Sequence, residues 1–158
     1  MSDRRAIATV RIRQARPDEA ERLSELARRS KASWGYDEDF MRRAAVELTI
    51  TRDAIASHEV WVLEDEGDAI LGFHRVISGD PAVLEDLWLE PEAMGAGHGR
   101  RLWEHAAAVA RRGGASAMEL DADPNALAFY ERMGAVRVGV RPSAVVAGRE
   151  LPRMRLEL

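Results

Sequence analysis

Residues 84–106 (LEDLWLEPEAMGAGHGRRLWEHA) constrain the fold of this chain more than any other segment. The segment opens with a largely apolar run that predicts a buried strand. Pro91 ends this run, because proline has no N–H group for a sheet ladder. A glycine-spaced turn follows, made by Gly95, Gly97 and Gly99. From about Arg100, apolar residues recur with the spacing of one helix face. The chain therefore places a strand, a tight turn and a helix in direct succession.

This succession favours an anion site at the start of the helix. The first helical N–H groups have no partner within the helix, and the helix dipole adds partial positive charge at the same end. Glycines let a ligand approach the backbone closely, and a phosphate suits such a place. Two nucleotide-binding patterns fail here. The turn lacks the Lys and Ser or Thr of the Walker A motif, and its order GxGxG differs from the dinucleotide fingerprint GxGxxG.

The turn resembles the acyl-CoA pyrophosphate loop of the GNAT acyltransferase superfamily. That loop has the form Q/R-x-x-G-x-G/A and follows a strand ending in an apolar residue, any residue and proline. Leu89-Glu90-Pro91 and the run from Met94 to Gly99 take these places. A second family motif, N-x-x-A-x-x-F-Y-E-x-x-G-F, is resembled by DPNALAFYERMG at residues 123–134. The two motifs occur in the expected order, and the resemblance covers nearly the whole chain.

The rest of the chain alternates strand and helix signals, and it predicts one α/β domain over residues 1–158 with the GNAT fold. The expected order is β-α-α-β-β-β-α-β-α-β-β, with a mixed central sheet of six or seven strands and four helices. Strands are expected at 6–13 (with Thr9 as an alternative start), 59–64, 69–78, 84–89, 116–122, 135–141 and 150–158. Helices are expected to open at Pro17, near Asp37, near Arg100 and after Pro124.

The resemblance implies acetyl-CoA as a cosubstrate and assigns its contacts to the backbone. The pantetheine arm would pair with Leu87, Trp88 and Leu89, and the pyrophosphate would lie on the amides that follow the strand. The loop residues are Met94, Gly95, Ala96, Gly97, His98, Gly99 and Arg100. Three of them depart from the family pattern: Met94 replaces Gln or Arg, Ala96 removes a basic side chain, and His98 replaces an aliphatic. His98 either packs under the helix or reaches a phosphate.

The implied reaction is transfer of an acyl group from a CoA thioester to an amine, which needs a base and an acid. Tyr130 matches the family tyrosine that protonates the CoA thiolate, although a core aromatic is the alternative. Glu85 is the first candidate base, against an exposed or ion-paired carboxylate. Its position alternates with two apolar residues of the strand, whereas Asp86 points to the other face. Glu119 and Asp121 are further candidates, and a chain of waters is the remaining option.

Four more residues are candidates for binding. Asp123 stands where the family usually has Asn, and Asn125 lies two residues on, so both are candidates for contacts with CoA. Trp34 and Tyr36 lie between the first two predicted helices. They either form a wall of the acceptor pocket, as this region commonly does in the superfamily, or pin the helix connection to the core.

Composition limits the compartment and the partners. Hydrophobic residues make up 46% and charged residues 32% of the chain, which is typical of a soluble globular protein. The chain has no cysteine and four scattered histidines, so we expect no disulfide and no metal. No apolar run approaches a membrane span, and we expect a cytoplasmic protein without a membrane partner. The net charge of −4 disfavours nucleic acid as the main partner.

The sequence leaves the acceptor open among a small molecule, a peptide N-terminus and a lysine side chain. The main expectation is an N-acetyltransferase that acts on a primary amine. An acyl-CoA-binding module without turnover and a GNAT toxin that acts on charged tRNA are the alternatives. A homodimer through the last two strands is a further expectation of the resemblance.

Overall fold

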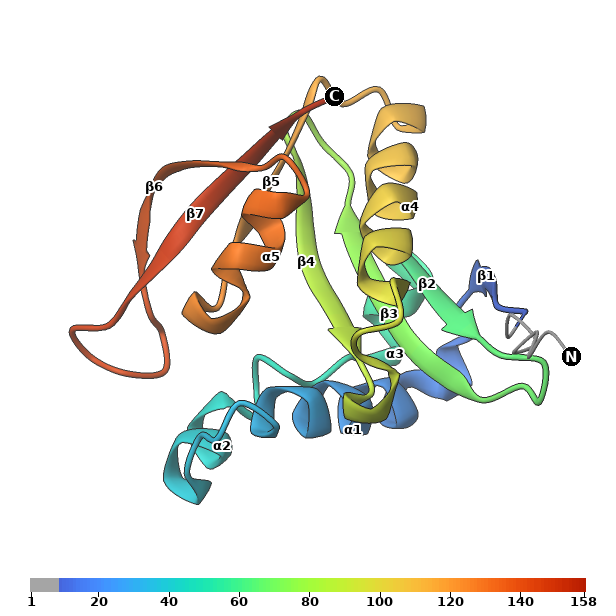
Figure 1. The fold of residues 1–158 in the computed structure, drawn as a ribbon, viewed down its shortest axis with the longest axis horizontal. Helices are drawn as coiled ribbons and strands as arrows, with labels where there is room; N and C mark the ends of the chain where they lie inside the picture. The colour runs from blue at the N-terminus through green and yellow to red at the C-terminus, as the bar shows by residue number, and fades with distance from the viewer. Residues whose placement is uncertain (1–8) are drawn as a thin grey trace, which may run out of the picture.

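The computed structural model describes residues 9–158. Its centre is a seven-stranded sheet in the order β1-β2-β3-β4-β5-β7-β6, with helices on both faces (Figure 1). The strands are β1 (Arg11–Gln14), β2 (Glu59–Glu64), β3 (Ile70–Ile77), β4 (Ala82–Leu89), β5 (Ala117–Asp121), β6 (Val136–Pro142) and β7 (Glu150–Glu157). The α-helices are α1 (Ala20–Ala32), α2 (Glu38–Ala44), α3 (Arg52–Ser57), α4 (His98–Arg112) and α5 (Leu127–Arg132). Of the neighbouring strands, β4 and β5 run parallel and the rest are antiparallel.

The predicted fold class and element order are confirmed, with two differences in detail. The structure adds α3, whose N-cap Thr51 accepts a hydrogen bond from the Ala54 amide. This helix is too short for its apolar positions to show a helical period, which explains why the sequence did not reveal it. The helix expected near Arg100 begins at His98, directly after Gly97. Residues 6–8 of the first predicted strand lie outside the described residues.

The core lies on both faces of the sheet. Helices α1 and α2 cover one face, where Leu23 and Leu26 pack in one apolar cluster with Phe73 of β3. Helix α4 covers the other face, where Trp103 and Ala106 pack with strands β3 to β5. Figure 1 shows α4 in front of β3 and β4, α1 and α2 below, and α5 between β4 and the β6–β7 hairpin. This layering leaves the carboxyl end of β4 directed toward α1, and the site is built there.

Strands β4 and β5 separate soon after they meet. Their pairing consists of Ala82 with Met118 and Val83 with Glu119. On its other side β4 continues to pair with β3 as far as Leu89. A β-bulge interrupts that ladder, because Val76 pairs with Leu84 and Arg75 pairs with Asp86, so that Glu85 is the extra residue. The bulge bends β4, and from Leu84 onward no strand covers its β5 side.

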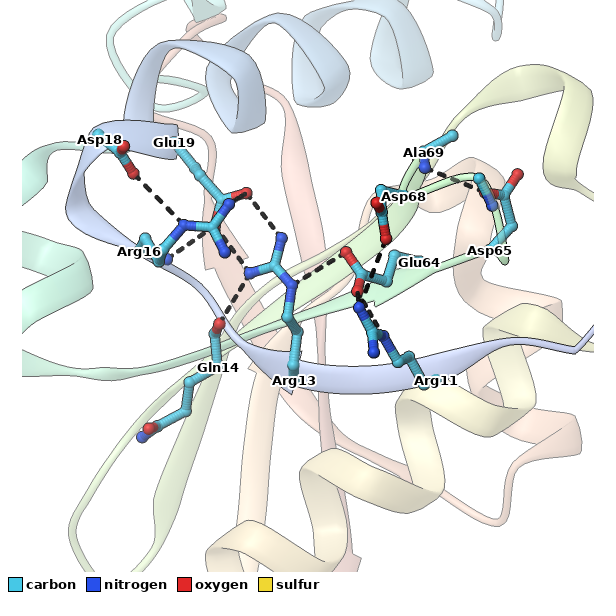
Figure 2. A network of polar contacts seen from close by, with 11 residues as sticks. Arg11, Arg13, Gln14, Arg16, Asp18, Glu19, Glu64, Asp65, Asp68 and Ala69 are labelled. Atoms are coloured by element: carbon cyan, nitrogen blue, oxygen red, sulfur yellow. Dashed lines mark hydrogen bonds and ion pairs between the residues drawn. The ribbon is translucent and has the colours of Figure 1, made fainter.

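The far edge of the sheet is held by an ion-pair network (Figure 2). Glu64 of β2 is buried and accepts hydrogen bonds from Arg11 and from Arg13 Nε, the latter at 2.9 Å. Arg13 also donates to both carboxylate oxygens of Glu19, at 2.9 and 2.8 Å. Burial alone would raise the pKa of Glu64, but the two guanidinium groups outweigh it and lower that pKa. The network joins β1 to β2 and to the turn that opens α1.

Candidate active site

The opening between β4 and β5 leads into a cavity of about 920 Å³. Its walls come from β4, the glycine loop, β5, α5, the C-terminal end of α1, the segment after α2 and the β6–β7 hairpin. Most of the predicted site residues meet here: Trp34, Glu85, Leu87, Trp88, Leu89, Met94, Gly95, Gly97, Gly99, Arg100, Asp123, Asn125 and Tyr130. Tyr36, Ala96 and His98 are not among its lining residues. Segments more than a hundred residues apart in the chain, from Ser30 to Arg153, therefore share one cavity.

The glycine loop has the backbone that an anion site requires. Gly95 and Gly97 have φ angles of 86° and 84°, in the left-handed region that favours glycine. No atom lies within 4 Å of the position that a Cβ would take at either residue, so this side of the loop is open. Helix α4 starts immediately afterwards, and no side chain caps its N-terminus. The first amides of a fifteen-residue helix are therefore free for a polyanion such as a pyrophosphate.

Gly99 has a different role from the other two glycines. A Cβ at this position would lie 3.1 Å from the ring of Phe129 and 3.6 Å from Leu89. The missing side chain lets Phe129 of α5 pack against the first turn of α4. This contact fixes the distance between the two motifs that the sequence analysis singled out.

The backbone of β4 next to the loop is open on one side. Leu87, Trp88 and Leu89 pair with His74, Phe73 and Gly72 of β3. Within the described part of the chain, no strand pairs with these residues on the β5 side. An extended ligand carrying amide groups can therefore add to this edge in the way that an extra strand would. The edge and the amides of α4 together fit acyl-CoA, which carries amides along its pantetheine arm and phosphates at its far end.

Tyr130 is a buried residue whose side chain reaches the cavity. Its ring packs against Trp103 and Phe129, with ring centroids 5.6 and 5.2 Å apart. Burial raises the pKa of the Tyr130 phenol, and the negative charges of Asp86 and Asp123 add to this. The phenol is therefore protonated over the whole working pH range. The phenol can therefore donate a proton, and the Tyr130 side chain forms part of both the core and the cavity wall.

The two acidic residues of the bulge differ in their surroundings. Glu85, the extra residue, is 46% exposed at its side chain and lies 3.9 Å from Arg75. Asp86 is buried, accepts from Arg75 Nε at 2.7 Å and from Trp88 Nε1 at 3.0 Å, and lies on the face opposite to Leu87. Burial raises the pKa of Asp86, and Arg75 offsets only part of that rise. Glu85 is consequently the freer of the two carboxylates.

Asp123 joins several segments of the site. Its carboxylate accepts from Lys31 Nζ at 2.6 Å and from Tyr36 Oη at 2.7 Å, and Arg149 of the β6–β7 hairpin lies 3.6 Å away. Its other oxygen accepts from the backbone and side-chain nitrogens of Asn125. Burial alone would raise the pKa of Asp123, but these contacts outweigh it and lower that pKa. Both predicted binding residues of this motif are thus engaged with other parts of the protein.

The aromatic residues after α1 support the acceptor side of the cavity. Trp34 lines the cavity and packs near Trp88, with ring centroids 6.0 Å apart. Tyr36 stacks on Phe40 at 3.9 Å and donates its hydroxyl to Asp123, so it lies behind the wall rather than on its surface. Tyr36 is therefore placed to hold the wall, and Trp34 to contact a ligand.

The structure adds site residues that the sequence did not single out. Arg75 faces Asp86 across the β3–β4 ladder, and Lys31 contacts Asp123. The contact between Asp86 and Trp88 could have been expected from the sequence, because Trp88 lies two residues after Asp86 and therefore on the same face of the strand. The contact between Lys31 and Asp123 spans 92 positions, so no local pattern could have shown it.

Residues 9–158 lack two kinds of feature. These residues contain no group of three or more His, Cys, Asp or Glu side chains that could hold a metal ion. None of the helices formed by the same residues is long and apolar enough to cross a bilayer.

Comparisons with known proteins agree with this geometry. The model of the acetyltransferase (GNAT) family matches residues 18–135. The peptidyl-lysine N-acetyltransferase YjaB of Salmonella typhimurium is 28% identical over 150 residues, which cover 93% of this chain and 97% of that protein. A GCN5-related N-acetyltransferase from Rhodopseudomonas palustris has a similar fold, with a TM-score of 0.79 at 18% identity over 96% of this chain and 97% of that one.

The PaiA N-acetyltransferase of Thermoplasma acidophilum, solved in complex with coenzyme A, is also similar. Its TM-score is 0.74 at 18% identity, over 95% of this chain and 99% of that one. The family match covers most of the chain and contains both the glycine loop and Tyr130. The chain therefore belongs to the GNAT acetyltransferase family and is an acetyl-CoA-dependent N-acetyltransferase.

Proposed function

We propose that this enzyme transfers an acetyl group to a primary amine of a peptide, with a lysine side chain as the first acceptor to test. The separation of β4 from β5 after two residue pairs carries the acetyl-CoA part of the proposal, because it exposes a strand edge that leads to the N-terminus of α4. The name of the Salmonella relative, a peptidyl-lysine N-acetyltransferase, supports the choice of acceptor.

The residues that would hold acetyl-CoA fall into two groups. Backbone groups of Leu87, Trp88 and Leu89 would hold the pantetheine arm, and the amides from Gly95 to Arg100 would hold the pyrophosphate. Because these contacts use the backbone, the unusual side chains Met94, Ala96 and His98 are compatible with binding. Bound acetyl-CoA supplies the thioester that the amine attacks.

Glu85 and Tyr130 are proposed to move the protons. An alkyl ammonium with a pKa of ~10.4 must lose a proton before it can attack. Glu85 is half-exposed beside the cavity and accepts that proton, directly or through a water. Tyr130 keeps its phenolic proton and gives it to the departing thiolate.

The first experiment measures cofactor binding. Thermal unfolding is followed with and without acetyl-CoA, and NAD and ATP serve as controls. Ligand at 100 times its dissociation constant adds about 2.7 kcal/mol to the free energy of unfolding, or roughly 5 to 10 °C for a domain of this size. A rise in Tm with acetyl-CoA alone supports the proposed cofactor site. No rise at saturating concentrations would contradict it.

The second experiment tests turnover and the acid. Release of the CoA thiol is measured with a lysine peptide, with the same peptide after its lysine is blocked, and with a small diamine. Tyr130→Phe should lower kcat by about 10² to 10⁴ while the dissociation constant of acetyl-CoA stays within twofold. An unchanged rate in Tyr130→Phe over the whole pH range would show that the acid is assigned wrongly.

Glu85→Gln tests the base in the same assay. The variant should lower kcat or move the pH optimum upward, because the amine must then deprotonate without help. A profile identical to that of the wild type would assign the proton transfer to water or to another carboxylate. The position of Tyr130 at the cavity favours this catalytic proposal over a binding module without turnover.

A further inference from the structure

Lys31 is the one lysine among the 23 lysine and arginine residues of the chain. It lies near the C-terminal end of α1 and lines the cavity, with 15% of its side chain exposed. Its ammonium nitrogen lies 2.6 Å from Asp123 Oδ2. Four aromatic rings surround it at 5.3 to 5.9 Å from their centroids: Trp34, Tyr36, Phe40 and Trp88. One carboxylate and four ring faces thus surround the side-chain nitrogen of Lys31.

The ammonium group of Lys31 has donors to spare. A lysine carries three N–H donors. Within residues 9–158, the oxygen of Asp123 is the acceptor that its nitrogen reaches by a hydrogen bond. Two N–H groups therefore remain for a ligand in the cavity that Lys31 lines. This arrangement fits a ligand that brings carbonyl oxygens.

The position of the ammonium group identifies which part of a ligand it would meet. Asp123 follows the end of β5, and Trp88 lies near the end of β4. Lys31 contacts both from α1, so its nitrogen lies across the opening between the two strands. This is the part of the cavity next to the free edge of β4. A chain lying along β4 would therefore run past Lys31.

We propose that Lys31 is a cofactor-binding residue that donates hydrogen bonds to an amide carbonyl oxygen of the pantetheine arm. The inference rests on the proposed function, since it requires acetyl-CoA to lie along β4. Asp123 is ionised and has no donor of its own, whereas the asparagine of the family motif carries an N–H₂ group. Lys31, held on Asp123, supplies the donor that this substitution removes.

The test separates the two ends of the cofactor. Isothermal titration calorimetry is run with acetyl-CoA and with adenosine 3′,5′-bisphosphate, which lacks the pantetheine arm. Lys31→Met should weaken acetyl-CoA binding by tenfold or more, because a charge-assisted hydrogen bond is lost, and leave the bisphosphate within about twofold. Arg22→Met removes a charge from an exposed position of the same helix and should change neither affinity.

The double variant Lys31→Met/Asp123→Asn provides the rescue. It restores a neutral amide donor at position 123 and removes the unpaired carboxylate, so acetyl-CoA affinity should recover most of the loss seen in Lys31→Met. Equal losses for both ligands in Lys31→Met would indicate a purely structural ion pair, and no recovery in the double variant would show that the lost donor is not what weakened binding. Either of these results, or unchanged acetyl-CoA binding in Lys31→Met, overturns the inference.

A measurement on the wild type covers the case in which a variant does not fold. With one lysine in the chain, ¹⁵N-labelled lysine gives one side-chain ammonium signal in the NMR spectrum. This signal should shift on addition of acetyl-CoA and stay in place with the bisphosphate. If acetyl-CoA binds without moving it, Lys31 is not a contact, while the proposed function stands. If the wild type binds neither ligand, the proposed cofactor site fails as well.

Discussion

His74 should make the stability of this fold depend on pH. The side chain is fully buried on β3, and its Nε2 lies 2.8 Å from Nδ1 of His105 on α4. Its Nδ1 is buried and finds no partner in the described part of the chain. Burial, together with the neighbouring charge of His105, lowers the pKa of His74 from 6.5 to about 3. A proton on His74 is therefore far less favourable in the folded state than in the unfolded one.

The size of the effect follows from linkage. Above about pH 6.5 His74 is neutral in both states and contributes no pH dependence. Between about pH 6.5 and 3 the unfolded state binds a proton that the folded state does not, so the free energy of unfolding falls as the pH falls. The slope approaches about 1.4 kcal/mol per pH unit. At pH 5 the loss from His74 is about 2 kcal/mol relative to pH 8, and it depends little on the folded pKa while that value lies well below 5.

Urea unfolding of the wild type and of His74→Gln at pH 8 and pH 5 tests this value. At pH 8 the difference between the proteins reports packing and the hydrogen bond to His105. At pH 5 only the wild type also loses stability through proton binding to His74 in the unfolded state. The difference in free energy of unfolding should therefore change by about 2 kcal/mol in favour of the variant. Carboxylates that titrate near pH 5 affect both proteins and cancel. Parallel pH dependences for the two proteins would refute the reasoning.

Three other substitutions test the geometry of the sheet and the loop. Gly72→Ala should lower the free energy of unfolding by about 1 to 3 kcal/mol, since its Cβ would lie 2.7 Å from a carbonyl oxygen of β4. In thermal unfolding Gly139→Ala, where no atom lies within 4 Å, should stay close to the wild type. Glu64→Gln should cost about 2 kcal/mol by urea unfolding, because two guanidinium groups lose their buried partner, whereas Asp68→Asn at the exposed end should change little. Gly97→Ala should lower the free energy of unfolding by about 1 kcal/mol, because residue 97 has a left-handed backbone conformation, and it should weaken acetyl-CoA binding measured by calorimetry. Unchanged stability and affinity would contradict the assigned loop conformation.

The sequence by itself determined the fold class and the position of the glycine loop before α4, because both depend on local patterns. Apolar runs with period two, Pro91 and the spaced glycines are properties of short segments, and each segment indicates its own structure. The strands observed at β2, β3, β4, β6 and β7 lie within about two residues of those expected. The site residues Tyr130, Glu85, Asp123 and Trp34 could likewise be named from motifs and resemblance.

The tertiary structure decided how these residues are used. Whether Glu85 follows the regular alternation depends on the bulge between β3 and β4, which arises from the pairing of two strands and leaves no mark in either alone. Asp123 is a candidate binding residue in the sequence, but in the fold its carboxylate is shared by Lys31, Tyr36 and Asn125. These contacts join segments about ninety residues apart, whose meeting depends on how α1 packs beneath β4 and β5. Local sequence patterns therefore identify the candidate residues, whereas long-range packing determines which residues they contact.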